Sequence, residues 1–505
     1  MTNKHIPGRE NFVNTDKVLA QKYAADFSIP LELAHIVAKR FPKYNEAKAF
    51  LFPDVNDLLD PATIPDIESA ADEIIASINK KEGILIYSHD DVDGFTSAAI
   101  MYKTLKDIYR TDEELIFVYP LVREKDGYIL NGEVLREYKQ KGVKLVITVD
   151  FGISSEHNFQ IAEDLGLKLV VCDHHETCSI DFTVPVVDPK RPDSRYPFRE
   201  LAGAGVSFKF AQFFYQKIFR LTANEFFKLK KEFFPLVMMG TISDRVMVRG
   251  ENRIFCTHGL QIYNRINEPW INHFRGERQA SIANIVSEVI PTIASAAYCD
   301  PNYGVGILVS DTSDYITETV TKLRAVTVER RKDVELLFKN ALAAAKIFPN
   351  MIISIIPFSK QHYLGAVAAR LKSYYKRTTV VIGIKDDKCF GELRSDDIDL
   401  FKMLYHLKQY FLDFGGHRRA AGFTMLRQSL DMYVDKTIQY TSELKAIAGN
   451  RSSAPQPLPE GFLNKSDIGI LKSLAPFGEG NPAPLLTDGV DVYTIDNRFF
   501  IIDKK

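Results

Sequence analysis

The sequence predicts an α/β protein built on a parallel sheet, and three observations support this fold class. Between residues 82 and 190, short apolar segments alternate with helix-like segments, as in GILIYS followed by TSAAIMYKTLKDIY. The apolar segments are continuous, which is typical of strands that helices cover on both faces. Acidic and imidazole side chains follow several of these segments, at the sheet edge where α/β proteins place their active sites.

The bulk composition limits the kinds of function that fit. A length of 505 residues predicts roughly three domains. The 64 Lys and Arg residues nearly balance the 65 Asp and Glu residues, so a polyanion needs a local basic groove or a metal to hold it. The five cysteines form no CxxC pair, which indicates reduced thiols and a cytoplasmic protein. Without an apolar leader, or a run of about 18 apolar residues, we expect neither secretion nor a membrane span.

The chain divides into five predicted sections. Residues 1–80 form a helical lead-in with the amphipathic segments PLELAHIVAKRF and NEAKAFLF. Residues 81–290 form a domain around the parallel sheet, and residues 291–346 form a helical connector. Residues 347–448 form a smaller α/β domain with the strands MIISIIPF, TTVVIGI, KCFGELRS and GFTML. Residues 449–505 combine a linker, GNRSSAPQPLPEG, with a short C-terminal segment.

Four strand-like segments deliver acidic or imidazole side chains at or just beyond their carboxyl ends. Several carboxylates within a few ångströms cannot all stay ionised without a cation. One divalent ion would leave ligands unused, whereas two ions bridged by a carboxylate would use them. Oxygen donors with some imidazole suit Mn²⁺ or Mg²⁺, and such ion pairs serve displacement at phosphorus. The residues are His89, Asp91 and Asp93 after ILIYS, Asp150 after LVITV, Asp173, His174 and His175 after LKLVVC, and Asp244 after PLVMMGTIS.

Other interpretations of these clusters explain less. SHDDVDG has part of the cadence of an EF-hand calcium loop, but it starts with His89 and has Ile100 where the bidentate glutamate belongs. A solvated turn explains any one acidic cluster, and a pair of loop histidines explains CDHHE alone. Four clusters on successive segments favour one shared site. Asp90, which falls between ligands at alternate positions, is not expected to bind metal.

The four clusters resemble the motifs of the DHH phosphoesterases, as SHDDVDG, VITVDFG, CDHHE and GTISD. Further segments resemble the RecJ-like branch, the 5′→3′ single-strand exonucleases: PLVREKDGY, VVDPKRPDSRYPFRELAGAGVSFKF, FGGHRRAAGF and LAPFGEGNPAP. The resemblance implies a DHH catalytic domain, a long connecting helix and a smaller DHH-associated domain. Because the chain ends soon after LAPFGEGNPAP, it implies only a partial OB-like segment at the C-terminus.

The resemblance also implies roles for the clustered residues. Asp150 would bridge two divalent ions, Mn²⁺ or Mg²⁺, and His175 would face the scissile phosphate. Asp150, Asp173 and His175 would form the catalytic set, with metal-activated water as the nucleophile. The implied metal ligands are His89, Asp91, Asp93, Asp150, His174 and Asp244.

In the second domain the resemblance implies a phosphate-binding element. Gly415 and Gly416 would let the backbone approach a phosphate, and His417 would donate to it. Arg394, with Ser395, would make a further contact. From the residues alone, a tight turn with a surface histidine, and a solvated arginine, remain open. The segment ARLKSYYKRTT (369–379) fits a strand-tracking surface or an ordinary amphipathic helix equally well.

The implied activity is a metal-dependent 5′→3′ exonuclease that releases nucleoside 5′-monophosphates from single-stranded nucleic acid, DNA in preference to RNA. Its partners would include repair or replication proteins, and no membrane. The alternative is a phosphodiesterase of the same superfamily that acts on very short oligonucleotides or cyclic dinucleotides. A non-enzymatic scaffold is a third class, which the presence of all six ligand positions opposes.

Three features depart from the RecJ pattern. The first motif starts with His89 where aspartate is usual, although histidine is common in other DHH branches. An Asn-Ala-x-Gly-Arg element, expected around residues 289–304, is absent. The OB-like segment is incomplete. The last two departures favour a reduced grip on long strands.

Overall fold

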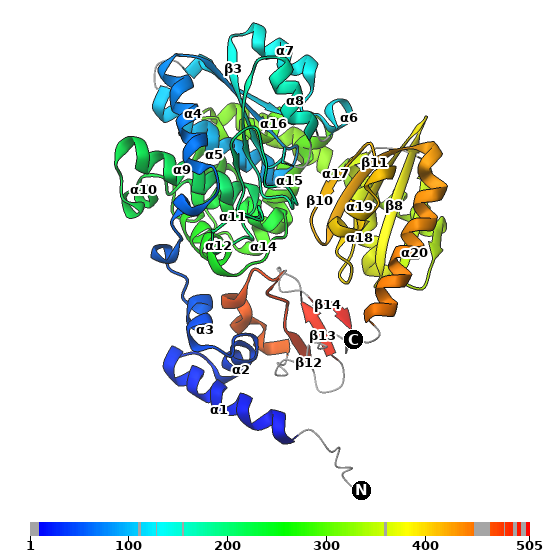
Figure 1. Cartoon of the computed structure of the whole chain (residues 1–505). Coiled ribbons are helices and arrows are strands. Elements are labelled where there is room, and N and C mark those ends of the chain that lie inside the picture. The colour runs from blue at the N-terminus through cyan, green and yellow to red at the C-terminus, as the bar shows by residue number, and fades with distance from the viewer. Residues whose placement is uncertain are drawn as a thin grey trace, which may run out of the picture.

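The computed structural model describes residues 10–109, 113–127, 129–153, 156–357, 361–448, 465–478, 480–487, 492–495 and 501–504. Figure 1 shows a large α/β unit, a smaller α/β unit beside it, and a group of N-terminal helices near the C-terminal strands. The expected linker at 449–461 lies outside the described residues. No helix in the described part of the chain is both long and apolar enough to span a membrane.

The large unit contains a five-stranded sheet in the order β2-β1-β3-β4-β5. Every neighbouring pair in it is parallel, which confirms the predicted sheet. The order places β1 and β3 in the middle, so their carboxyl ends open at the centre of one edge. The strands are β1 (Gly83–Ser88), β2 (Ile116–Pro120), β3 (Val143–Val149), β4 (Lys168–Cys172) and β5 (Val186–Val187).

Helices cover both faces of this sheet, as the continuous apolar strands predict. Ile84 and Ile86 point into the larger core, whereas Leu85 and Tyr87 point into a second core on the opposite face. Every residue of β1 is therefore buried. The larger core contains α4 (Ile67–Asn79), α5 (Val92–Tyr109), α9 (Gly203–Phe219), α11 (Phe233–Ser243), α12 (Gly250–Tyr263) and α16 (Asn302–Val309). The opposite face is covered by α7 (Gly132–Gln140) and α8 (Glu156–Asp164).

One strand-like segment is in fact a helix. FFPLVMMGTIS forms α11, and Asp244 is its C-cap residue. Its residues from Phe233 to Thr241 are all buried. A helix that is apolar all round has no helical periodicity, so its sequence looks like that of a buried strand. Asp244 nevertheless reaches the predicted crevice, but from a helix end and not from the sheet.

The connector helix α17 (Ser313–Ala343) joins the large unit to the smaller one. The smaller unit has a six-stranded sheet in the order β10-β11-β9-β8-β7-β6, in which only the pair β7 and β8 is parallel. Helix α18 (Gln361–Tyr375) packs on one face, and α19 (Leu400–His406) and α20 (Leu430–Ala448) belong to the core on the other. The strands are β6 (Ala345–Ile347), β7 (Met351–Pro357), β8 (Thr378–Lys385), β9 (Lys388–Arg394), β10 (Asp413–Gly416) and β11 (Ala420–Leu426).

The N-terminal helices pack against the segment that follows the linker. Leu471, Leu474 and Phe477 share a core with α2 (Leu31–Arg40) and α3 (Tyr44–Leu51). The buried Arg253 guanidinium joins the two parts: it lies 4.3 Å from the centre of the Phe50 ring and donates to the carbonyl oxygens of Phe50 and Ser473. An antiparallel sheet of β12 (Leu485–Thr487), β13 (Val492–Ile495) and β14 (Ile501–Lys504) follows, and its OB-like character stays a prediction.

Candidate metal centre

Five elements of the large unit bring their ends to one crevice. His89 follows β1, Asp150 follows β3 and His174 follows β4. Asp93 lies in the first turn of α5 rather than on an extended segment, and Asp244 ends α11. The crevice therefore lies at the carboxyl edge of the parallel sheet, as predicted.

Asp93 is held at the N-terminus of α9. Its two carboxylate oxygens accept hydrogen bonds from the backbone N–H groups of Gly203 (2.7 Å) and Ala204 (2.9 Å). This approach requires glycine nearby. A Cβ at Gly203 would lie 2.6 Å from Asp150 Oδ1, and one at Gly240 would collide with the Asp93 carboxylate. The glycines of AGAG and MMGT thus let two helices close on the carboxylates.

His174 presents a ring nitrogen to three carboxylates. Its Nδ1 lies 2.9 Å from the carbonyl oxygen of Leu201, which holds the proton on that nitrogen. Nε2 is then an acceptor, 3.1 Å from Asp150 Oδ1 and 3.7 Å from oxygens of Asp93 and Asp244. Burial, followed by the nearby charges of His175 and Lys190, lowers the pKa of His174, so the ring is neutral. A neutral imidazole nitrogen that faces carboxylates is suited to bind a cation together with them.

Burial and mutual repulsion both disfavour the ionised form of these carboxylates. Burial and the neighbouring Asp91 raise the pKa of Asp93 to about 7. Burial and Asp93 raise the pKa values of Asp150 and Asp244 well above the ordinary range. Within the described residues, His174 Nε2 and Asp244 Oδ2 are buried without a hydrogen-bond partner. A divalent cation would relieve both the repulsion and the missing partners, so the donor set fits such an ion.

The possible donors form three groups: His174, His175 and His417 make one, and the other two share Asp150. His89, Asp91 and Asp150 make the first of these two, and Asp93, Asp150 and His174 make the second. His89 Nδ1 lies 3.1 Å from Asp91 Oδ2. Two ions with Asp150 between them would use both groups. Asp244 lies beside the second group through its contact with His174.

Asp90 faces elsewhere, as expected from its place between the ligands. It is buried and forms an ion pair of 2.7 Å with Arg123, at the start of α6 (Arg123–Asp126). This ion pair connects the segment after β1, which carries His89 and Asp91, to the segment after β2. Its partner belongs to PLVREKDGY, a segment whose role could not be assigned from sequence.

Asp173 does not face the crevice itself but orients His175, which follows it in the chain by two residues. It is buried, and its oxygens accept hydrogen bonds from the backbone N–H groups of Ile153 (3.0 Å) and His174 (2.7 Å). Its Oδ1 also lies 2.6 Å from His175 Nδ1. Although burial alone would raise it, the contact with His175 holds the pKa of Asp173 well below its usual range. The Asp173 carboxylate therefore fixes the ring of His175, with Nε2 pointing outward.

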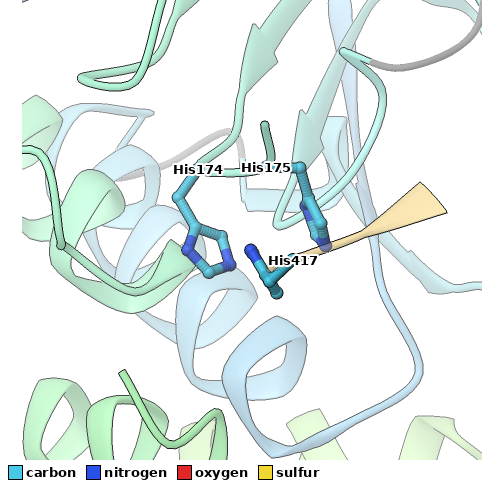
Figure 2. Close-up of side chains that lie close together, drawn as sticks. All are labelled: His174, His175 and His417. Atoms are coloured by element: carbon cyan, nitrogen blue, oxygen red, sulfur yellow. The ribbon is translucent and has the colours of Figure 1, made fainter. Parts of the chain in front are cut away.

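His417 reaches this site from the second domain, as Figure 2 shows. Its ring is stacked on that of His175, with centroids 4.5 Å apart and planes at 14°, and lies 4.7 Å from that of His174. Its Nε2 is 4.0 Å from Asp244 Oδ2. The alternative of a surface histidine is therefore excluded by the fold. Residues of both domains therefore line the crevice, and His417 is the contribution of the second domain.

Lys190 adds a positive charge that the sequence analysis missed. Its Nζ lies 3.4 Å from His417 Nδ1 and 3.7 Å from Glu176, although the residue is almost fully buried. Burial and Lys190 lower the pKa of His417, which keeps that ring neutral. A buried ammonium beside neutral imidazoles provides donors for an anion. The segment DPKRP was available in the sequence, but its position relative to the second domain was not.

The other residues predicted to bind substrate, in the second domain, differ in what they contact. Gly415 and Gly416 end β10, and Gly416 has a φ of 127°, which favours glycine at the turn before His417. Arg394 forms an ion pair of 3.0 Å with Glu392 and lies near Arg245, where burial and Arg394 lower the pKa of the Arg245 guanidinium. Ser395 is buried, and its hydroxyl bonds Thr378 and two backbone N–H groups, so it holds the loop.

Comparisons with known proteins agree with this fold. Residues 83–241 match the DHH family, N-terminal domain, and residues 349–443 match the DHHA1 domain. The chain belongs to the DHH family. Within that family it is similar to RecJ proteins, which several of its curated relatives are.

Among these relatives is the single-stranded-DNA-specific exonuclease RecJ of Bacillus subtilis, 29% identical over 482 residues. The match covers 90% of this chain and 58% of that relative, so the chain spans little more than half of its length. RecJ of Escherichia coli is 23% identical over 491 residues, with 90% and 84% covered. The structure of Thermus thermophilus RecJ in complex with Mn²⁺ has a TM-score of 0.72 at 20% identity, covering 95% of this chain and 71% of that one. This likeness confirms the fold.

Metal removal and pH are expected to act together on stability. The pKa of Asp93 is about 7 in the folded protein, above its ordinary value of 3.8. The neutral carboxyl thus contributes stability that is present below about pH 4 and is lost as pH rises to about pH 7. In EDTA the melting temperature should therefore fall between about pH 4 and pH 7. Mn²⁺ needs ionised ligands, so its stabilisation should grow over the same interval, reaching roughly 5–10 °C at one hundred times Kd.

Thermal melts with EDTA or Mn²⁺ across this pH range provide the measurement. Asp107→Asn is a matched control because Asp107 lies at the other end of α5, paired with Lys230. It should keep the Mn²⁺ response. A Mn²⁺ shift that does not change with pH would contradict the clustered carboxylates.

Proposed function

We propose that this protein is a metal-dependent exonuclease for single-stranded DNA that hydrolyses phosphodiester bonds from the 5′ end and releases nucleoside 5′-monophosphates. The observation that carries the proposal is the joint crevice: the neutral rings of His174 and His417 face buried carboxylates across two domains. The RecJ relatives support single-stranded DNA as the substrate. Structures of RecJ with Mn²⁺ and Mg²⁺ support these ions as cofactors.

Each part of the crevice has a distinct task in this proposal. His89, Asp91, Asp93, Asp150, His174 and Asp244 hold two divalent ions. When bound, such ions lower the pKa of water and stabilise the charge that develops on phosphate. The Asp93 carboxylate would be presented to such an ion in one orientation, because both of its oxygens accept hydrogen bonds from the backbone of α9.

The histidines and cations hold the substrate. His175, oriented by Asp173, and His417, beside Lys190, form a wall of stacked rings that donates to a phosphate. Arg123 and Arg394 supply further positive charge at the edges of the site. Because His417 comes from the second domain, a bound strand would lie between two protein surfaces, which favours single-stranded over duplex substrate. We also propose repair or replication proteins as partners, by likeness to the RecJ branch.

Substrate length and polarity test this proposal. With Mn²⁺, we expect mononucleotides to appear from 5′ ends of labelled single-stranded DNA, with weaker activity on RNA and on duplex. The rate should rise as the strand lengthens from two to about twenty nucleotides, because more contacts form. A rate that peaks at dinucleotides would favour the short-oligonucleotide alternative. Intact labelled DNA in every metal would rule out both.

A further inference from the structure

A cavity of about 430 Å³ lies where the catalytic domain meets the second domain, and the activity described above does not use it. One wall comes from the catalytic domain, three residues after His175, and the others come from α19 and α20. The cavity falls in the size range of small-ligand sites. It is lined by Cys178, Phe401, Lys402, Tyr405, His406 and Tyr440.

A short basic turn connects this cavity to the metal crevice. The turn between β10 and β11 carries His417, whose ring lies in the crevice, and then Arg418 and Arg419, which are exposed. The carbonyl oxygen of Arg418 accepts a hydrogen bond of 2.8 Å from the N–H of Leu400, the first residue of α19. The backbone of the turn is therefore anchored to α19, the helix that carries Phe401, Tyr405 and His406. Positive side chains in this position suit a polyanionic backbone that leaves the crevice.

The walls of the cavity are aromatic and partly open. Tyr405 is 43% exposed, and its ring is stacked with that of Phe401 at 28°. The rings of His406 and Tyr440 lie 5.0 Å apart at 35°. Lys408 Nζ lies 4.8 Å from the centre of the Tyr405 ring, and Lys402 lies at the rim, where Asp399 at 3.6 Å offsets part of its charge. Aromatic walls with lysines at the rim match a nucleobase attached to a phosphate.

We propose that this cavity is a nucleobase subsite: a base of the single strand, one or a few nucleotides from the hydrolysed bond, stacks among Tyr405, His406 and Tyr440 while its backbone follows Arg418 and Arg419. The proposal rests on the proposed function, because it takes the strand to start in the metal crevice. Stacking uses the face of a base, so the subsite accepts every base. It would therefore strengthen binding without sequence preference.

The segment 369–379 is the competing surface for such a strand. Tyr374 on α18 is 64% exposed, but the nearby cations are already paired, Arg370 with Glu335 at 2.8 Å and Lys372 with Asp396 at 2.7 Å. These pairs favour an ordinary helix surface. Tyr374→Ala is thus a suitable control, because it removes an exposed tyrosine that lies outside the cavity.

Oligothymidylates with one 2-aminopurine at successive positions from the 5′ end provide the probe. Binding is measured in EDTA, where no turnover occurs, and hydrolysis is measured separately with Mn²⁺. We expect the fluorescence to be quenched by stacking at one or two neighbouring positions in the wild type. Tyr405→Ala should remove this quenching and weaken binding about tenfold, by raising KM more than it lowers kcat. Tyr405→Phe should retain the quenching, and Tyr374→Ala should behave as the wild type.

The outcomes separate this subsite from the proposed function. Quenching that depends on Tyr405, in a protein that hydrolyses no DNA, would support the subsite and reject the exonuclease. Hydrolysis with no position-dependent quenching, or with quenching unaffected by Tyr405→Ala, would overturn the subsite. Loss of quenching in Tyr374→Ala instead would place the strand on α18 and also overturn it. Melting temperatures within a few degrees of the wild type verify that each variant is folded.

Discussion

Asp150→Asn is expected to abolish hydrolysis while the fold remains intact. Asp150 is common to two of the three groups of possible metal donors, so losing its charge should cost about a thousandfold in kcat, or roughly 4 kcal/mol. Asparagine is a better test than alanine, because Asp150 has a φ of 65° and asparagine tolerates this left-handed conformation. The substitution therefore removes the charge without straining the backbone. Since its carboxylate is repelled by Asp93, Asp91 and Asp244, the metal-free variant should melt no lower than the wild type.

The measurement combines hydrolysis of labelled single-stranded DNA with a thermal melt in EDTA. Asp107→Asn, in which the change is the same but lies outside the crevice, should retain the wild-type rate. A variant at Asp150 that keeps its turnover would reject the metal mechanism. A large drop in melting temperature would instead assign the lost activity to misfolding.

Glu251→Gln is expected to have the largest effect on stability. Glu251 and Lys209 form a buried ion pair of 2.6 Å, and the side chains are 3% and 0% exposed. Glu251 also accepts hydrogen bonds from Tyr196 (2.5 Å) and from the N–H of Leu59 (2.9 Å), which anchors the lead-in to the catalytic domain. Neutralising it leaves the Lys209 ammonium buried without its counter-charge. Such a loss costs roughly 3–5 kcal/mol.

Chemical or thermal unfolding of the variant measures this cost. Replacing both residues by apolar ones of similar size, Glu251→Leu with Lys209→Met, should destabilise the protein less than Glu251→Gln alone, because no uncompensated charge remains. A single variant that unfolds at the wild-type midpoint would show that the pair contributes no net stability. The surface pair of Lys141 with Glu137 is a suitable comparison, since its loss should cost below about 1 kcal/mol.

Local sequence patterns were sufficient for the sheet and for the donor types. The strands around Ile86 and Val146 are continuous apolar runs with helical crossovers, which is the pattern of a parallel sheet that helices cover on both faces. The types of metal donor could likewise be predicted from neighbouring residues, because the donors directly follow those apolar runs in the sequence. The pattern failed at PLVMMGTIS, where a fully buried helix and a buried strand have the same composition.

Contacts between distant segments were beyond the reach of such patterns. Lys190 and His417 are 227 residues apart in the chain and meet across two domains. Likewise, Gly203 and Gly240 are ordinary helix residues by sequence, and only the approach of Asp150 and Asp93 explains why a side chain is excluded there. Nothing in the segment HETCSID indicates that Cys178 faces the aromatic residues of α19.

The sequence by itself therefore determined the parallel sheet, the kinds of donor at its carboxyl edge and the DHH family, since each depends on residues that are close together in the chain. The tertiary structure alone decided that Asp173 orients His175, that His417 joins the crevice, and that Cys178 shares a cavity with aromatic residues of the second domain. The reason is physical: hydrophobic periodicity specifies which face of an element is buried, whereas the packing of whole domains decides which faces meet.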